Sequence, residues 1–395
     1  MSGRRIYSID ALRGLIMIIM ALDHVRDFFH RAAMASSPTD LAVTTPALFL
    51  TRWITHFCAP VFMLTAGLGA FLWWQSSGRT QSQLSIFLLT RGLWLMVLEL
   101  TVMQLAYNFD VSASYPVFLL VLWVLGLCMI GLAAMVWRPA GWLLAVCVAT
   151  IALHNLADGI SAAQFGSFAP AWTLLHQVGV FGLAGWTFIV GYPLVPWIAV
   201  MGLGFALGPL FLMVPVRRRQ ILSRAGVALM IAFVVLRALN GYGDPSRWSP
   251  QPSATYTVLS FFNTTKYPPS LIFLLMTIGP ALAALAWLDR RSLSSSHPLV
   301  IFGRVPLFYF VLHFLAAHVA VVIVSFAIYG RAAFAFVFHP VPSMGGPRQL
   351  YPADFGFGLS AVYMMWALIV ATMYPLCRWF AGVKARRREW WIRYL

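Results

Sequence analysis

The stretch SIDALRGLIMIIMALDHVRDFFHR, residues 8–31, decides the fold class of this chain. Its apolar run from Leu15 to Leu22, together with the residues around it, predicts a helix that crosses a membrane. At about 100° per residue, most ionisable residues of this helix fall within roughly 160° of its circumference, and Arg26 lies outside that arc. The residues inside the arc are Asp10, Arg13, Asp23, His24, Asp27 and His30.

This one-sided distribution of ionisable residues points to a functional site. Charged or titratable side chains are costly in a bilayer, usually face the interior of a helix bundle and are candidates for function. Charges near the ends of a helix can instead extend their polar groups to the interface. That explanation suits Arg13 and Arg31 but suits His24 poorly. We therefore expect His24 to lie at the centre of the site.

The composition of the whole chain is that of an integral membrane protein. The chain is 61% hydrophobic and 10% charged, and its mean hydropathy is +0.81, far from the balance of a soluble domain. Each membrane-crossing segment must be helical, because an open strand would leave unpaired backbone groups in lipid. We predict a single domain over residues 1–395, an all-α polytopic bundle with about ten spans at 9–29, 48–74, 86–107, 116–136, 140–157, 193–214, 222–239, 269–288, 299–327 and 358–382.

The net charge is +16, and the positive residues are distributed as the positive-inside rule describes. The charge therefore does not indicate a nucleic-acid partner. If the N-terminus is cytoplasmic, both termini are cytoplasmic, and most Lys and Arg residues outside the spans lie on the cytoplasmic side. The expected membrane is a plasma membrane of the bacterial inner-membrane type. The cytoplasmic cations are Arg4, Arg5, Arg79, Arg138, Arg217, Arg218, Arg219, Arg224, Arg290, Arg291, Arg378, Lys384, Arg386, Arg387, Arg388 and Arg393.

The Gly-rich apolar stretch at residues 178–192 needs separate treatment. It is short for a span, and counting it as one would place Arg217, Arg218 and Arg219 outside. We therefore expect a re-entrant or interfacial element within a long outer loop.

His24 and His56 are expected at one depth, in the outer half of the membrane. His24 lies about 8 Å from the outer end of the first helix, and His56 lies similarly far inside the second helix, which runs the opposite way. Asp27 follows His24 by one turn and could orient its ring, the usual general-base arrangement. Arg52 lies one turn from His56. Two histidines could also bind a metal, but the chain has no HExxH motif or tight ligand cluster, so we expect no metal.

The ninth span, within FGRVPLFYFVLHFLAAH at 302–318, adds further candidates. Arg304 lies near its cytoplasmic end. His313 lies near mid-membrane, one turn after Tyr309. His318 faces elsewhere, and we expect it to be structural.

Charges in two other spans have different expected roles. Lys266, in NTTKYPPS at 263–270, places a positive charge near the outer mouth of the eighth span. Arg91 and Glu99 lie on one face of the third span. There, a structural ion pair with other helices explains them at least as well as a catalytic role.

Five segments follow one another in order across most of the chain: SIDALRGLIMIIMALDHVRDFF (8–29), THFCAPVFMLTAG (55–67), YPLVPWIAVMGLGFALG (192–208), TKYPPSLIFLLMTIGPAL (265–282) and FGRVPLFYFVLHF (302–314). Together they resemble the membrane acyltransferase family whose best-known member is the lysosomal heparan-α-glucosaminide N-acetyltransferase. The first and fourth segments are the longest and most specific. The resemblance is to a bacterial-type member, because the large soluble luminal extension of the lysosomal enzyme is not found in this sequence. A polymeric heparan acceptor is therefore not implied.

The resemblance implies transfer of an acetyl group from cytoplasmic acetyl-CoA to a sugar amine or hydroxyl on the far side of the membrane. In the family, a polar residue late in the first helix and a histidine close after it are linked to catalysis. The first matches His24 by its spacing from Arg13 and Gly14. The second has no direct counterpart in this chain: His30 is nearest in sequence, and His56 replaces it best in depth. Direct transfer and an acetyl-imidazole intermediate therefore both stay open.

With this resemblance, the candidate residues fall into three groups. The first is catalytic: His24, Asp27, His56 and His313. The second would bind the CoA phosphates: Arg13, Arg91 and Arg304, with Arg290 and Arg291 at the rim. The third lies on the acceptor side: Asp23, His30, Arg52, Lys266 and Tyr309.

A proton-coupled transporter or exporter is the main alternative to an acyltransferase. It would use the same kinds of intramembrane Asp, His and Arg residues, but no inverted repeat is detectable in the sequence. A structural or sensory membrane protein is the third class. The acceptor, the acyl chain length and the oligomeric state, a homodimer included, stay open.

Overall fold

The computed structural model describes residues 5–76, 78–109, 115–339, 341–344, 346–387, 389, 392 and 394. Three of the predicted cytoplasmic cations, Arg4, Arg388 and Arg393, lie outside the described residues. The described chain is mainly α-helical and has three short strands. The elements are α1 Tyr7–Phe29, α2 Pro46–Thr55, α3 Cys58–Gln75, α4 Gln81–Leu98, α5 Gln104–Asn108, β1 Val117–Leu119, α6 Val121–Met135, α7 Ala140–Leu153, α8 Ala169–Leu175, β2 Gly179–Leu183, β3 Trp186–Val190, α9 Leu194–Ala206, α10 Pro215–Leu239, α11 Ala254–Phe262, α12 Leu271–Leu288, α13 Pro298–Arg304, α14 Pro306–Tyr329 and α15 Leu359–Arg386.

Within the described residues, 8 helical segments are long and apolar enough to cross a membrane. The other two predicted spans are occupied by α1, which carries several charges, and by α6, which has 15 residues. The prediction of an all-α polytopic membrane protein is therefore confirmed.

Two of the predicted spans are broken next to a proline. The span expected at 48–74 consists of α2 and α3, which are interrupted at His56 and Phe57, because in a continuous helix the Pro60 ring would clash with the His56 carbonyl. The span expected at 299–327 is interrupted at Val305, directly before Pro306. His56 therefore lies at a helix end and not, as expected, inside a continuous helix.

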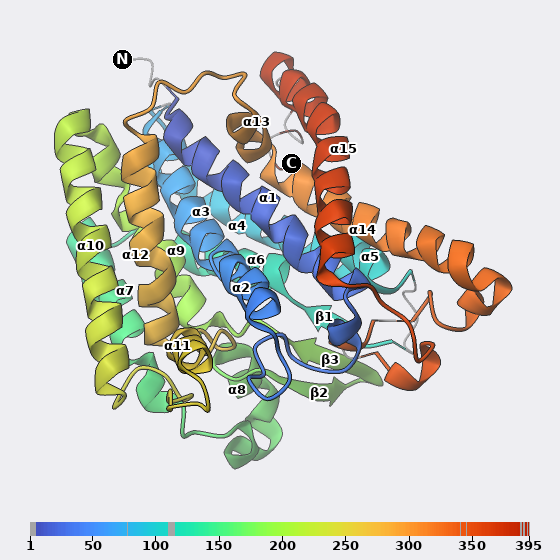
Figure 1. The fold of residues 1–395 in the computed structure, drawn as a ribbon. Coiled ribbons are helices and arrows are strands. Elements are labelled where there is room, and N and C mark those ends of the chain that lie inside the picture. Colours follow the sequence, from blue (N-terminus) through green and yellow to red (C-terminus); the bar gives the residue numbers. More distant parts are fainter. Residues whose placement is uncertain are drawn as a thin grey trace.

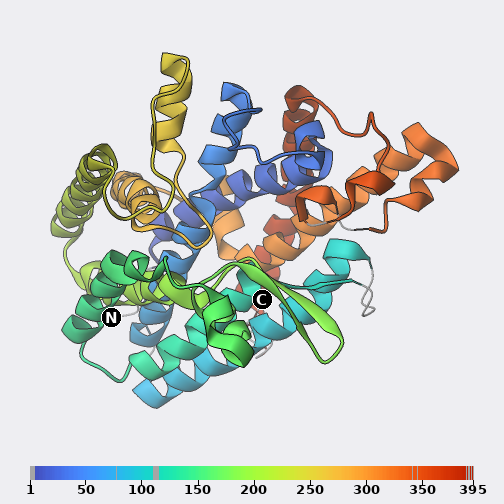
Figure 2. The ribbon, with the colours of Figure 1, turned by 90° about the horizontal axis from the view of Figure 1, so that it is seen from below.

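The stretch at 178–192 is a β-hairpin at one end of the bundle. Its turn residues Ala184 and Gly185 have φ values of 50° and 82°, and positive φ at both positions is what a type I′ turn requires. β2 pairs antiparallel with β3, and β1 pairs parallel with the other edge of β3. β1 also occupies the beginning of the span expected at 116–136. Figure 2 views this end of the molecule, with the green hairpin lying across it.

The two ends of the bundle differ in charge and in structure. In Figure 1, α1 begins and α15 ends at one end, while the sheet, α8 and α11 lie at the other. Arg217, Arg218 and Arg219 lie at the start of α10, at the same end as the start of α1. We name the end where α1 begins the basic end, and the end that carries the three strands the sheet end. The positive-inside rule favours a cytoplasmic basic end, and this orientation stays a prediction.

The first helix lies in the middle of the bundle, where it packs against α3, α13, α14 and α15. Its closest approach is to α13. A Cβ atom on Gly14 would lie 1.8 Å from the Leu299 carbonyl oxygen, and one on Gly303 would lie 1.7 Å from the Asp10 carbonyl oxygen. Small residues allow such close helix contacts in membranes. Gly14 and Gly303 thus fix the position of α1, the helix that carries most of the candidate site.

Candidate functional site

A cavity of about 1200 Å³ lies at the sheet end of the bundle. We name it the outer cavity. Helices α1, α2 and α14 contribute to its wall, together with all three strands and the loops around residues 32–39 and 263–267. It brings together many of the residues proposed from the sequence: Asp23, His24, Asp27, His30, Arg52, His56 and Lys266.

The two aspartates of the outer cavity are paired with arginines. The Arg26 guanidinium forms an ion pair with the Asp23 carboxylate at 2.8 Å and donates a hydrogen bond to Asp27 at 2.6 Å, and Arg52 donates a charged hydrogen bond to Asp23. The structure therefore places Asp27 against Arg26, and not against His24 as the orienting partner that the sequence suggested. Helical spacing placed Arg26 outside the arc of ionisable residues. Its side chain is nevertheless only 4% exposed and reaches the carboxylates of both Asp23 and Asp27.

His24 lies in the outer cavity among aromatic rings. Its ring centroid is 5.1 Å from that of His313, 4.8 Å from that of Phe314 and 6.2 Å from that of Phe310. The buried Nδ1 atom has no hydrogen-bond partner among the described residues. His56 also lines the cavity, but the imidazole packed against His24 is that of His313. A buried nitrogen without a hydrogen-bond partner, such as Nδ1 of His24, is costly unless it binds a ligand or takes part in a reaction.

Behind His24, His313 and Tyr309 form a stacked pair on α14, with ring centroids 4.8 Å apart. Nδ1 of His313 lies 2.7 Å from the Tyr309 carbonyl oxygen. Since a carbonyl can only accept, Nδ1 carries the proton, and in the neutral ring Nε2 carries the lone pair. Neither this Nε2 nor the Tyr309 hydroxyl has a partner among the described residues. Tyr309 was expected on the acceptor side, but it does not line the outer cavity.

The contacts of His318 are those expected of a structural residue. Its ring stacks on Phe109 with centroids 4.0 Å apart and on Phe28 at 4.8 Å. Its Nδ1 lies 2.6 Å from the carbonyl oxygen of Ala106. These contacts use the ring to join α14 to α1 and to the end of α5.

Lys266 and two tyrosines form the loop side of the outer cavity. Lys266 is 7% exposed, and its ammonium lies 5.1 Å from the centre of the Tyr267 ring. The hydroxyls of Tyr192 and Tyr267 are 3.2 Å apart. Burial raises the pKa of Tyr267, but the positive charges of Lys266 and Arg52 outweigh this effect, so its pKa lies below the ordinary value. Burial and the neighbouring Tyr267 raise the pKa of Tyr192.

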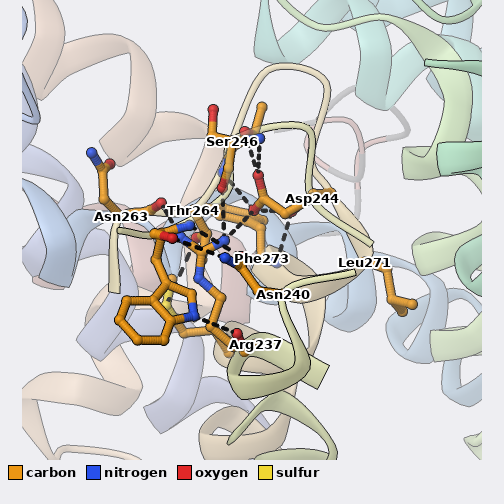
Figure 3. Close-up of polar contacts among 12 residues, drawn as sticks. Arg237, Asn240, Asp244, Ser246, Asn263, Thr264, Leu271 and Phe273 are labelled. Carbon is orange, nitrogen blue, oxygen red and sulfur yellow. Dashed lines mark hydrogen bonds and ion pairs between the residues drawn. The ribbon is translucent and has the colours of Figure 1, made fainter. Parts of the chain in front are cut away.

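The loop that carries Lys266 is held by Arg237 and Asp244, which the sequence analysis did not single out (Figure 3). Arg237 is 2% exposed and donates hydrogen bonds to the carbonyls of Phe261, Ser260, Ser246 and Asn263 at 2.8–3.1 Å. Asp244 accepts from the backbone N–H and hydroxyl of Thr265, from the Ser270 hydroxyl and from the Ser246 N–H. Buried side chains with all these partners fix the loop on both sides of Lys266.

A second cavity, of about 380 Å³, lies among α1, α3, α4, α6, α14 and α15. We name it the inner cavity. Its lining is largely apolar, and its charged residues are Arg13, Arg91 and Lys384. Arg13 donates to the Thr65 carbonyl oxygen and lies over Gly69, where a Cβ atom would be 2.6 Å from the guanidinium. Gly69 therefore leaves the space that Arg13 occupies.

The inner cavity includes two of the five arginines expected to bind the CoA phosphates. Arg304 does not line it and lies instead within electrostatic range of Arg5 and Asp10. Arg290 and Arg291 are exposed after the end of α12, and Arg291 stacks on Trp287. From the sequence, Lys384 was expected only as one of the cytoplasmic charges. Its place on α15, far along the chain, could not be related to Arg13 without the fold.

Glu99 is fully buried, and its partners differ from those expected. The sequence suggested an ion pair, but the carboxylate accepts hydrogen bonds from the Tyr107 hydroxyl at 2.9 Å and from the backbone N–H groups of Leu120 and Leu122 at 3.2 and 3.0 Å. It therefore binds the first turn of α6, where the N–H groups lack helical partners and the dipole favours a negative charge.

The two cavities lie back to back. Of the described residues, Val121 and Phe310 line both of them. His24 lies on the outer side of this boundary, edge-on to Phe310. The geometry thus joins a smaller, largely apolar cavity with cations to a larger, more polar cavity with histidines, and His24 lies close to their junction.

Comparison with protein families gives one finding. The family model described as heparan-alpha-glucosaminide N-acetyltransferase, catalytic, matches residues 5–242, more than half of the chain. The matched part includes His24, His56, Arg13 and Arg91. Lys266 and the whole of α14 lie beyond it. A comparison with curated proteins finds no match.

Proposed function

Because this chain belongs to the heparan-α-glucosaminide N-acetyltransferase family of transmembrane acyltransferases, we propose that it transfers an acetyl group from acetyl-CoA to a sugar amine or hydroxyl. In this proposal the donor enters at the basic end from the cytoplasm, and the acceptor enters at the sheet end, outside a bacterial-type inner membrane. The supporting observation is the pair of back-to-back cavities with His24 at their junction.

The inner cavity suits the donor. Its apolar walls match the pantetheine arm, and Arg13, Arg91 and Lys384 supply cations for the phosphates. Arg13 precedes His24 by eleven residues in the same helix, which is about 16 Å along the axis. A thioester at the end of a long arm would thus reach the level of His24 while its phosphates stayed near Arg13.

The outer cavity suits a polar acceptor. It presents the positive groups of Arg52 and Lys266, the hydroxyls of Tyr192 and Tyr267, and backbone groups of the loops. Such convergent polar groups are what a sugar needs, since each hydroxyl or amine seeks a hydrogen-bond partner in a buried site. The larger volume of this cavity leaves room for more than one sugar ring.

His24 is the proposed general base. The acceptor nitrogen or oxygen attacks the thioester carbonyl, a C–N or C–O bond forms and the C–S bond breaks. His24 takes the acceptor's proton, which then passes to the sulfur of CoA. His313, with its lone pair on Nε2 and its ring 5.1 Å from that of His24, would assist as a second base. A transient acetyl-imidazole on His24 is the other route, and it uses the same residues.

The proposal can be tested with protein purified in detergent, acetyl-CoA as donor and glucosamine as the first acceptor. We expect binding of CoA, release of free thiol and formation of N-acetylglucosamine detected by mass spectrometry. If glucosamine is not the right sugar, CoA binding and slow acetyl-CoA hydrolysis are still expected. A protein that shows neither, but moves protons or sugars across vesicles, would be an exporter instead.

A further inference from the structure

Phe310 lies at the boundary of the two cavities and next to both imidazoles. Its side chain is 6% exposed and contributes to the wall of each cavity. Its ring centroid lies 6.2 Å from that of His24 and 5.9 Å from that of His313, in edge-on arrangements. A thioester in the inner cavity would therefore meet the Phe310 ring just before it reached a histidine.

Val121 is the other described residue that lines both cavities, and hydrogen bonds on either side fix its backbone. Both neighbouring residues, Leu120 and Leu122, donate their N–H groups to the two oxygens of Glu99. The Tyr107 hydroxyl holds one of these oxygens from α5. A buried carboxylate with several charge-assisted hydrogen bonds is rigid. The hydrogen bonds of Glu99 thus hold Val121 at the boundary. The proposed acetyl transfer does not itself require Glu99.

A barrier at this place has a chemical purpose. The outer cavity is the larger and more polar of the two and would hold water, whereas the inner cavity is smaller and largely apolar. Water that reached the thioester could attack its carbonyl, break the C–S bond and give acetate and free CoA. His24 would accelerate this reaction as it accelerates transfer, since it lies at the boundary. Exclusion of water is a recognised way in which active sites prevent such side reactions.

We propose that Phe310 and Val121 form a hydrophobic barrier that keeps water away from the donor thioester, and that Glu99 is the positioning residue that holds it. The inference rests on the proposed acetyl-CoA-dependent function. It predicts that opening the barrier increases the hydrolysis of acetyl-CoA relative to transfer of its acetyl group. The relevant quantity is the ratio of thiol released without acceptor to thiol released with acceptor.

The main test is Phe310→Ala, with acetyl-CoA at saturating concentration and no acceptor present. We expect thiol release to rise by about tenfold or more, because a positioned base that contributes roughly 10²–10⁴-fold in rate would then act on water. His24→Ala in the Phe310→Ala background should remove most of this gain. Acetate should appear in the same amount as free CoA.

Phe314→Ala is the matched control. Phe314 lies one turn further along α14, is equally buried, and contacts His24 with ring centroids 4.8 Å apart, but it lines only the outer cavity. Its loss should change the environment of His24 without opening the boundary, so hydrolysis should not rise. Phe310→Leu keeps apolar bulk at the boundary and should stay near the wild-type ratio.

Glu99→Gln tests the positioning role. An amide has one acceptor oxygen in place of two, so it cannot accept from both Leu120 and Leu122 through separate oxygens. We expect a rise in the hydrolysis ratio in the same direction as for Phe310→Ala, but smaller. A purely structural role would lower transfer and hydrolysis together and leave the ratio unchanged.

The outcomes separate this inference from the function on which it rests. If the wild-type protein binds no CoA and releases no thiol, the proposed function fails. If the wild type transfers acetyl but Phe310→Ala, shown to be folded and to bind CoA, keeps the wild-type hydrolysis ratio, the barrier fails and the function stands. Equal increases for Phe310→Ala and Phe314→Ala would also overturn the barrier.

Discussion

The outer and inner cavities are built by opposite means. The inner cavity is walled by helices alone, and its described charges are all positive: Arg13, Arg91 and Lys384. The outer cavity is walled largely by loops and strands, and it holds both carboxylates and cations. A helix wall gives a narrow, fixed, apolar channel. A wall of loops gives a wide pocket whose polar groups can be arranged freely.

The difference in wall structure indicates which cavity would determine substrate specificity. If the proposed function is right, every member that uses CoA needs the same narrow channel, and helices are suited to preserve it. The acceptor would then be selected by the loop that Arg237 and Asp244 hold in place (Figure 3). Loops on a rigid scaffold are the usual place for binding residues.

The membrane orientation is the first prediction, because its result is all-or-none. Reporter fusions after Arg219 and after Leu395 should both indicate the cytoplasm, because the cations gather at the basic end. Leu395 lies outside the described residues and serves only as the attachment point. A reporter outside the membrane at either position would turn the inner cavity away from the cytoplasmic acetyl-CoA pool.

The next largest effect is expected from His24→Ala. A positioned base contributes roughly 10²–10⁴-fold in rate, so acetyl transfer at saturating acetyl-CoA should fall by about that factor. CoA binding should survive, because His24 lines only the outer cavity. The measurement is the transfer rate together with CoA affinity in the same preparation.

His30→Gln provides the control for that variant. His30 also lines the outer cavity, but it lies at the end of α1, where its Nδ1 accepts the Ala32 N–H. Burial and the charges of Arg26 and Arg31 lower its pKa, so the neutral side chain of Gln is a fair replacement. A small loss is expected. If His30→Gln were as damaging as His24→Ala, the base would have to be assigned to His30.

Arg13→Gln should affect the other cavity. Loss of a charge-assisted hydrogen bond typically costs roughly 1.5–3 kcal/mol, so the affinity for both acetyl-CoA and free CoA should fall by about 10–100-fold. Arg290→Gln is the matched control, since Arg290 is exposed and does not line the inner cavity. Titration calorimetry with free CoA gives both values. Equal losses in the two variants would mean that the donor lies across the rim of the bundle instead.

Features set by a single helix could be predicted from the sequence. The spacing of Asp23, His24 and Asp27 along one helix placed all three in one cavity. The opposite directions of neighbouring spans correctly brought His56 to the same cavity. Hydrophobic length alone located the spans, because the bilayer fixes the length that an apolar helix needs.

Features set by contacts between distant segments could not be predicted. Whether Asp27 pairs with Arg26 or orients His24 depends on side-chain conformations that helical spacing does not fix. The approach of His313 to His24 depends on the rotation of α14 against α1. Glu99 was compatible with an ion pair in the sequence, and only the fold shows that it binds the start of α6.

The smallest effect is expected for Asp27→Asn, which compares the two carboxylates of the outer cavity. Asp27 is 29% exposed and paired with Arg26, and a partly exposed ion pair typically contributes about 0.2–1 kcal/mol. Transfer should therefore fall by no more than about fivefold. Asp23→Asn should cost more, because that carboxylate is less exposed and is shared by two arginines. The comparison is made by transfer rate and thermal unfolding midpoint of both variants. A folded Asp27→Asn protein as inactive as His24→Ala would show that Asp27 leaves Arg26 and orients the His24 ring during turnover.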